Sequence, residues 1–277
     1  MKPVAFDYER PTRVEEVCEL LASDTLFAKP LAGGQSLGPM LNLRLVQPDL
    51  VVDVTRVPEL SRVDDEGDAV VVGACVTTAA IEDGCVPGRT GRVLAGVAGA
   101  IAYRAVRNRG TIGGSLAHAD PAADWPSCLV ALGAEAVVRG PAGSRAVAVE
   151  DFMAGAFEVS LEPGEILEAL RIPRLSESAR WAYYKFCRKT GEFAEAIGAV
   201  LHDPERSVHR VVMGATHARP IVLADPSELL SAKGPRGGEG LDLDAARGLL
   251  ARAGLEADTY ESRIHITALA RALEQAA

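Results

Sequence analysis

The sequence predicts an α+β fold, because its strands and helices follow one another without the regular βαβ alternation of a doubly wound sheet. Two short apolar runs are predicted as buried strands, Leu50–Val54 and Ala69–Ala74. Other segments repeat apolar residues at helical spacing, most clearly between residues 93 and 101. No internal repeat appears at a fixed period.

The N-terminal segment predicts an extended piece, a helix, a glycine-rich loop and a strand. Residues 5–8 are extended, and Thr12 is a candidate N-cap for the helix. The apolar face of that helix consists of Val14, Val17, Cys18 and Leu21. A glycine-rich segment, 32–45, then leads into the strand that begins at Leu50, and its apolar second half is compatible with a short helix.

A second unit begins near Arg56, and an acidic turn precedes its first strand, Ala69–Ala74. One apolar helix face follows, made of Val93, Leu94, Val97, Ala98 and Ile101. After a second glycine-rich segment, strands are expected near Glu135–Val138 and Glu165–Ile172, where Pro173 interrupts the pattern.

The last hundred residues predict strands followed by helices. Residues 181–186 alternate weakly, and Val208–Ala215 has the composition of a strand. Gly234–Gly240 is expected to form a flexible connector. Two helices close the chain, with apolar faces made of Ala246, Leu249, Leu250 and Ala253 and of Leu269, Ala272 and Leu273.

Composition limits the classes of function. The net charge of −9 argues against general nucleic-acid binding, which needs a basic surface. No apolar run approaches eighteen residues, so no membrane span is expected, and the first residues lack a signal peptide. We therefore expect a cytoplasmic protein. The five cysteines have no metal-ligand spacing, which weighs against a zinc or iron–sulfur site in this chain.

Two glycine pairs are the most informative local features. Gly33 and Gly34 lie between Ala32 and the pair Gln35-Ser36. Glycines permit positive φ and close approach of a ligand, and successive amides in such a turn can hold an anion. A helix starting after Ser36 would favour the same negative charge. Alone, the segment is weak evidence for a ligand, because such a turn is more often purely structural.

The second pair has the same design in the sequence. Gly113 and Gly114 are flanked by Thr111 and Ser115, and three arginines precede them, Arg104, Arg107 and Arg109. Two such loops would suit the two phosphates of a pyrophosphate. Neither matches the dinucleotide fingerprint GxGxxG or the P-loop. The arginines are equally compatible with a solvated or subunit-facing cluster.

At these residues the chain resembles the FAD-binding medium subunits of the molybdenum hydroxylases, the group of aerobic carbon monoxide dehydrogenase and xanthine dehydrogenase. The resemblance rests on AGGQSLGPMLNLRL at 32–45, RNRGTIGGSLAHADPAAD at 107–124 and GEILEALRIP at 164–173. Weaker similarity occurs at 181–194 and 211–220. The motifs occur in the family's order over nearly the whole chain.

The resemblance implies a two-subdomain FAD-binding fold of the vanillyl-alcohol oxidase type, followed by a C-terminal domain with a small antiparallel sheet and helices. The implied boundaries are 1–55 for FAD-binding subdomain 1, 56–175 for subdomain 2 and 179–277 for the C-terminal domain. FAD would lie non-covalently between the two N-terminal subdomains, with both glycine loops on its pyrophosphate.

Individual roles also follow from the resemblance. The two loops that it assigns to the pyrophosphate are Ala32, Gly33, Gly34, Gln35, Ser36 and Leu37, and Thr111, Ile112, Gly113, Gly114 and Ser115. It implies that Asp124 accepts hydrogen bonds from the cofactor, and that Leu167 lies near the flavin ring. Ile101 falls where some relatives place an aromatic residue on the flavin.

Lys185 matches a lysine close to the isoalloxazine, where a cation could stabilise reduced flavin and so take part in catalysis. A solvated lysine on a strand edge is the alternative. Glu192 replaces the aspartate that is more usual in the family, and Phe193 follows it where an aromatic residue often shields the ring. The roles of these two residues stay open.

The resemblance implies an oxidoreductase subunit that takes electrons from the [2Fe–2S] clusters of a small subunit and passes them to an external acceptor. A large subunit would hold the molybdopterin, in a dimer of heterotrimers. Two alternatives stay open: a self-sufficient FAD oxidoreductase of the same cofactor-binding superfamily, and a flavin-containing scaffold without turnover. The substrate and the acceptor, whether NAD, a quinone or O₂, do not follow from the sequence.

Overall fold

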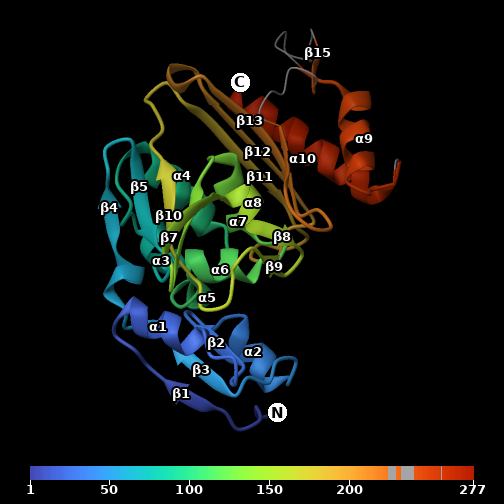
Figure 1. Ribbon diagram of the computed structural model, residues 1–277. Coiled ribbons are helices and arrows are strands. Elements are labelled where there is room, and N and C mark those ends of the chain that lie inside the picture. The colour runs from blue at the N-terminus through green and yellow to red at the C-terminus, as the bar shows by residue number, and fades with distance from the viewer. Residues whose placement is uncertain (224–228, 232–239, 257) are drawn as a thin grey trace.

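The computed structural model describes residues 1–223, 229–231, 240–256 and 258–277, and three separate sheets organise it (Figure 1). The expected mixture of helices and strands is confirmed. Each sheet is built from one continuous stretch of chain, so the sheets follow one another from the N-terminus to the C-terminus. No described helix has the length and hydropathy needed to cross a membrane.

The first sheet is parallel, with β3 between β1 and β2. Its elements are β1 (Asp7–Glu9), α1 (Val14–Leu21), β2 (Ala28–Leu31), α2 (Leu37–Asn42) and β3 (Leu50–Asp53). The expected strand at Leu50 is fully buried, because α1 packs its apolar face against it. The expected cap is wrong: the N-cap of α1 is Arg13, and Thr12 uses its backbone N–H to donate to Glu16.

The second sheet is antiparallel, in the order β4-β5-β10-β6-β7. Its strands are β4 (Val63–Asp65), β5 (Ala69–Gly73), β6 (Glu135–Gly140), β7 (Gly143–Ala148) and β10 (Ile166–Pro173). The helices that accompany them are α3 (Thr78–Glu82), α4 (Gly88–Gly99), α5 (Arg104–Arg107), α6 (Ile112–His118), α7 (Asp124–Ala131) and α8 (Val149–Phe152). A small ribbon pairs β8 (Met153–Gly155) with β9 (Glu158–Val159).

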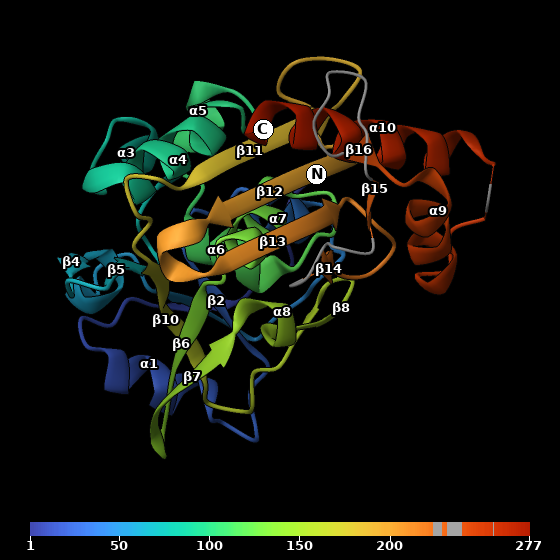
Figure 2. The same cartoon turned by 90° about the horizontal axis from the view of Figure 1, so that it is seen from above.

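The third sheet is antiparallel, in the order β11-β12-β13-β14. Its strands are β11 (Arg180–Phe186), β12 (Ala196–Asp203), β13 (Val208–Gly214) and β14 (Ile221–Leu223), and the segments after it are β15 (Leu230–Ser231), β16 (Gly240–Leu241), α9 (Leu243–Arg252) and α10 (Tyr260–Ala276). Helix α10 lies across β11 and β12 on one face, whereas α7 packs against β12 and β13 (Figure 2).

The most regular sequence patterns predicted their elements well. The strands expected near residues 69, 135, 165, 181 and 208 are all present, as are the two closing helices. The strand β10 ends at Pro173, where the pattern was expected to be interrupted. The connector expected at Gly234–Gly240 lies almost wholly outside the described residues.

The contact between α10 and the third sheet passes through a glycine. A Cβ atom at Gly198 would lie 2.5 Å from the carbonyl oxygen of Ala268 and 2.8 Å from Cα of Leu269. The helix can therefore rest directly on the main chain of β12. Because a methyl group there would push the helix away, the close approach depends on this residue.

We expect Gly198→Ala to lower the free energy of unfolding by about 1–3 kcal/mol, because the added methyl group forces α10 off the sheet. Chemical denaturation of the purified chain measures the change. Gly248→Ala in α9 is the control, because a Cβ there would meet only the Arg252 guanidinium at 3.9 Å. Equal stability of the two variants would contradict this packing.

Candidate functional site

The first glycine loop, Ala32–Ser36, connects β2 to α2, and several of its main-chain N–H groups have no hydrogen-bond acceptor in the described residues. Gly34 has φ of +71°, the left-handed conformation that glycine adopts without strain. Within the described part of the chain, no protein acceptor receives the N–H groups of Gly34, Gln35, Ser36 or Leu37. The loop is half-exposed to exposed, so these donors are free for an anionic ligand.

The second glycine loop has a different local structure, which corrects the expected similarity. Thr111 is the N-cap of α6, and its hydroxyl accepts from the N–H of Gly114 at 3.0 Å. Ile112 donates to the Val76 carbonyl and Gly113 to the Ala74 carbonyl, each across to the chain after β5. The amide of Ser115 donates to Thr111 within the helix. Every amide from residue 112 to 115 therefore already has a protein acceptor.

The structure brings the two loops together. A Cβ atom at Gly33 would overlap the carbonyl group of Arg109 and lie 2.9 Å from Cα of Gly110. On the other side of the contact, a Cβ atom at Gly114 would lie 3.8 Å from Cβ of Ala32. Gly33 thus lets the main chains of the two loops touch directly. Segments almost eighty residues apart in the sequence form one surface.

Two of the three arginines before the second loop are committed to acidic partners. Arg107 forms a bidentate ion pair with Glu82, with distances of 2.8 Å, and also donates to the Ile101 carbonyl. Arg104 donates to Glu82 and to Asp83 at 2.7 Å each. Arg109 is exposed, and its guanidinium has no ion pair or hydrogen bond in the described residues. It is the uncommitted cation beside the loop contact.

A buried ion pair connects α7 to β11. Lys185 Nζ donates to Asp124 Oδ2 at 2.8 Å, and the two side chains are only 8% and 4% exposed. The hydroxyl of Tyr183 donates to Asp124 Oδ1 at 3.0 Å. Burial raises the pKa of the Asp124 carboxyl, and the neighbouring ammonium of Lys185 opposes that rise. Burial also raises the pKa of Tyr183, so its hydroxyl stays protonated as a donor.

The remaining residues from the sequence analysis lie in varied environments. Leu167 is a residue of β10 that is 3% exposed and packs in the hydrophobic core, which leaves little of it to contact a ligand. Ile101 is half-buried, two residues after the end of α4. Glu192 is exposed, and Phe193 is 65% exposed in the loop between β11 and β12. Their roles stay predictions.

Sequence reasoning missed the partners that fix these side chains. Tyr183 and Lys185 lie two residues apart, so the alternation of a strand puts both on one face, and this spacing could have paired them. Glu82 and Asp83 carry no comparable signal, since they lie more than twenty residues before the arginines that they bind.

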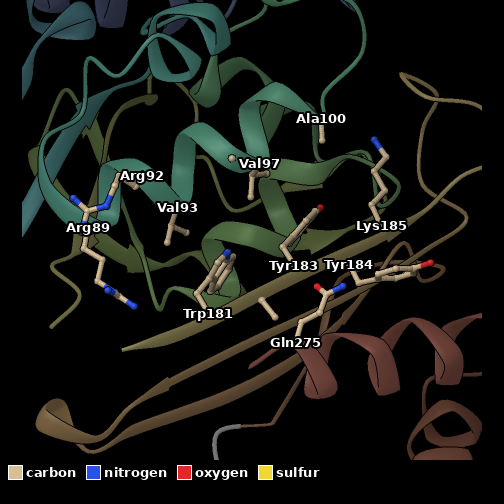
Figure 3. Close-up of a pocket in the computed structure, with 12 residues that line it drawn as sticks. Arg89, Arg92, Val93, Val97, Ala100, Trp181, Tyr183, Tyr184, Lys185 and Gln275 are labelled. Carbon is tan, nitrogen blue, oxygen red and sulfur yellow. The ribbon is translucent and has the colours of Figure 1, made fainter. Parts of the chain in front are cut away.

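A cavity of about 730 Å³ lies between α4 and β11 (Figure 3). Lys185 and Tyr183 line it from the strand, and Ala100 lines it from the position just after the helix. The cavity therefore adjoins the buried ion pair. The glycine loops do not contribute to its lining.

Comparison with known proteins agrees with these features. Residues 4–175 match the model of the FAD binding domain in molybdopterin dehydrogenase. The carbon monoxide dehydrogenase medium chain of Hydrogenophaga pseudoflava is 39% identical over 225 residues, covering 80% of this chain and 78% of the relative. The nicotine 6-hydroxylase medium subunit of Paenarthrobacter nicotinovorans is 35% identical over 269 residues, covering 96% and 91%.

Solved structures are similar over the full length. A chain of reconstituted CO dehydrogenase from Oligotropha carboxidovorans has a TM-score of 0.86 at 30% identity, covering 100% of this chain and 99% of its own. A chain of quinoline 2-oxidoreductase from Pseudomonas putida 86 has a TM-score of 0.82 at 30% identity, covering 100% and 98%. The chain therefore belongs to the family of FAD-binding medium subunits found in carbon monoxide dehydrogenase and related molybdenum hydroxylases.

Proposed function

We propose that this chain is the electron-transfer subunit of a heterotrimeric molybdenum hydroxylase. It takes electrons from the [2Fe–2S] clusters of a small subunit and passes them to an external acceptor. The observation that carries the proposal is the contact between the two glycine loops, which presents the open amides of Gly34–Ser36 beside the first turn of α6. The medium chains among its relatives support the subunit assignment.

The residues present fit FAD, because the open loop offers several amide donors to a diphosphate that has many acceptors. In this proposal, the amides from Gly34 to Leu37 bind the pyrophosphate. Thr111, Ile112, Gly113 and Gly114 hold the second wall rigid, and the half-exposed Ser115 contributes its hydroxyl. The uncommitted guanidinium of Arg109 adds positive charge beside the same surface.

The flavin supplies the redox chemistry, since it exchanges electrons singly or in pairs. The contribution of this chain is to bind and orient it. Asp124 holds the ammonium of Lys185 in place, and two N–H groups of that ammonium stay free of the pair. Lys185 is proposed to direct this positive charge toward the flavin ring, with Ile101 and Leu167 nearby. Asp124 then acts mainly as a positioning residue.

The domain boundaries are proposed at 1–55, 56–175 and 179–277, with the first two domains forming an FAD-binding pair of the vanillyl-alcohol oxidase type. Each of the three sheets falls wholly inside one of these ranges, which supports the division. The large molybdopterin subunit and a dimer of heterotrimers complete the proposed assembly.

The test is rapid mixing of the intact complex with its reducing substrate. Reduction of the clusters followed by bleaching of the flavin absorbance is the expected result. Flavin that stays oxidised beside reduced clusters would overturn the electron-transfer assignment and favour the scaffold reading. Turnover of a substrate by the isolated chain would instead favour a self-sufficient oxidoreductase.

Gly33→Ala should yield a folded chain that has lost FAD. The added methyl group overlaps the carbonyl group of Arg109, so the two loops must separate and the surface that they share opens. The ratio of flavin absorbance to protein absorbance measures the loss. Gly38→Ala is the matched control, since a Cβ atom there has no neighbour within 4 Å. Full flavin occupancy in the Gly33 variant would refute the loop assignment.

Lys185→Met should destabilise the chain by about 3 kcal/mol at pH 8, because it leaves the Asp124 carboxylate buried without its cation. The deficit should shrink as the pH falls. The pKa of Asp124 is already raised in the folded state, so the folded protein takes up a proton before the unfolded chain does.

Denaturation of the apoprotein across pH checks this prediction. Lys189→Met is the control, because Lys189 is exposed and should change stability by less than about 0.5 kcal/mol. A deficit that does not depend on pH would show that lost packing, and not the stranded carboxylate, causes the effect.

A further inference from the structure

The cavity between α4 and β11 has the form of an open groove with two unlike walls (Figure 3). One wall is the helix, which contributes Arg89, Arg92 and Gly96 among others. The other wall is the strand, and Gln275 of α10 lies at its rim. The proposed cofactor site explains only the Lys185 end of this groove.

The wall formed by β11 is the backbone edge of the third sheet and not one of its two faces. Five consecutive residues of β11, Trp181–Lys185, line the groove. Successive side chains of a strand point to opposite faces, so a cavity that touches all five must run along the backbone edge. Within the described ranges, β11 pairs only with β12 and is the first strand of its sheet. Its outer N–H and C=O groups therefore face the groove without a strand partner.

The helix wall leaves room beside that edge. Arg92, Gly96 and Ala100 follow one another at intervals of four residues and are all exposed, so they form one stripe along and just beyond α4. A Cβ atom at Gly96 would meet no atom within 4 Å. Small residues opposite a free strand edge let another backbone enter between the two elements. This is the geometry in which a strand is added to a sheet edge.

The charge of the groove indicates which kind of polypeptide segment could bind beside the strand edge. Arg92 is exposed and has no ion pair in the described residues, whereas Arg89 donates to the Ala179 carbonyl and lies 3.9 Å from Glu177. None of the described residues that line the groove is acidic. The ammonium of Lys185, at the opposite end, is balanced by Asp124. The net positive charge thus gathers at the Arg92 end.

Long unprotected strand edges are usually covered or blocked in soluble proteins. We propose that an extended segment of a partner subunit adds to β11 as an extra strand, with a carboxylate of that segment beside Arg92. The inference rests on the proposed function in one respect, namely that the chain works inside a multi-subunit complex. The segment lies over the Lys185 end of the groove and so covers one side of the proposed flavin site.

Hydrogen–deuterium exchange compares the isolated chain with the purified complex. Alternate amides between Trp181 and Lys185 should exchange at least about tenfold more slowly in the complex, because they gain strand hydrogen bonds. Unchanged exchange along β11 on assembly would overturn the proposal.

A groove-filling variant tests the same point without disturbing the fold. Gly96→Trp places an indole where a Cβ meets open space, so the isolated chain should keep its stability and its FAD. Its affinity for the partner subunits should fall by about tenfold or more. Gly248→Trp on α9 is the control for bulk. A Gly96 variant that assembles like the wild type would refute the inference.

Charge reversal supplies a second readout. Arg92→Glu should weaken assembly, more strongly at low ionic strength, whereas Arg263→Glu on the exposed face of α10 should not.

The proposed strand addition and the proposed electron-transfer function fail in different ways. Flavin that is reduced normally in a complex with unprotected β11 removes this inference alone, whereas failure of electron transfer with protected β11 removes the proposed function alone.

Discussion

The direct contact between two main chains, Gly33 against Arg109 and Gly110, is the constraint on which the site depends. No side chain can be accommodated between them, so the separation of the two loops is set here by backbone alone. The second loop can serve as a firm wall because its amides are already paired, to Ala74, to Val76 and within α6. The glycines of the second loop allow close packing against neighbouring residues, whereas Gly34 is needed because its backbone is left-handed. One rigid loop and one open loop thus share a single surface.

The sequence predicted those elements whose own composition decides them. Val-rich runs such as Ala69–Gly73 can hardly be anything but buried strands, and the glycine motifs carried the family resemblance. Helix α6 was missed because two successive glycines weaken a helix locally, and the cap at Thr111 together with packing against Ala74 overrides that preference. The assignment of Thr12 as a cap failed because Arg13 takes that position without any side-chain cap.

The sequence singled out candidate site residues but not the contacts that they make with one another. Two separate motifs indicated Asp124 and Lys185, yet their ion pair joins positions 61 residues apart and depends on how the third sheet packs on α7. The ion pairs of Arg104 and Arg107 with Glu82 and Asp83 likewise could not be predicted from the sequence. Only tertiary structure distinguishes these committed arginines from Arg109. A sequence lists charges, whereas the fold decides which of them remain available.

The ion pair buried between α7 and β11 restricts how the C-terminal sheet can move. Pulling β11 away from α7 would strand a carboxylate and an ammonium in a poorly solvated gap, and Tyr183 would lose its acceptor at the same moment. Rigid-body motion of the C-terminal sheet away from α7 is therefore energetically costly. The ion pair therefore fixes the distance between β11 and α7, because any motion that widens this gap must first break both contacts.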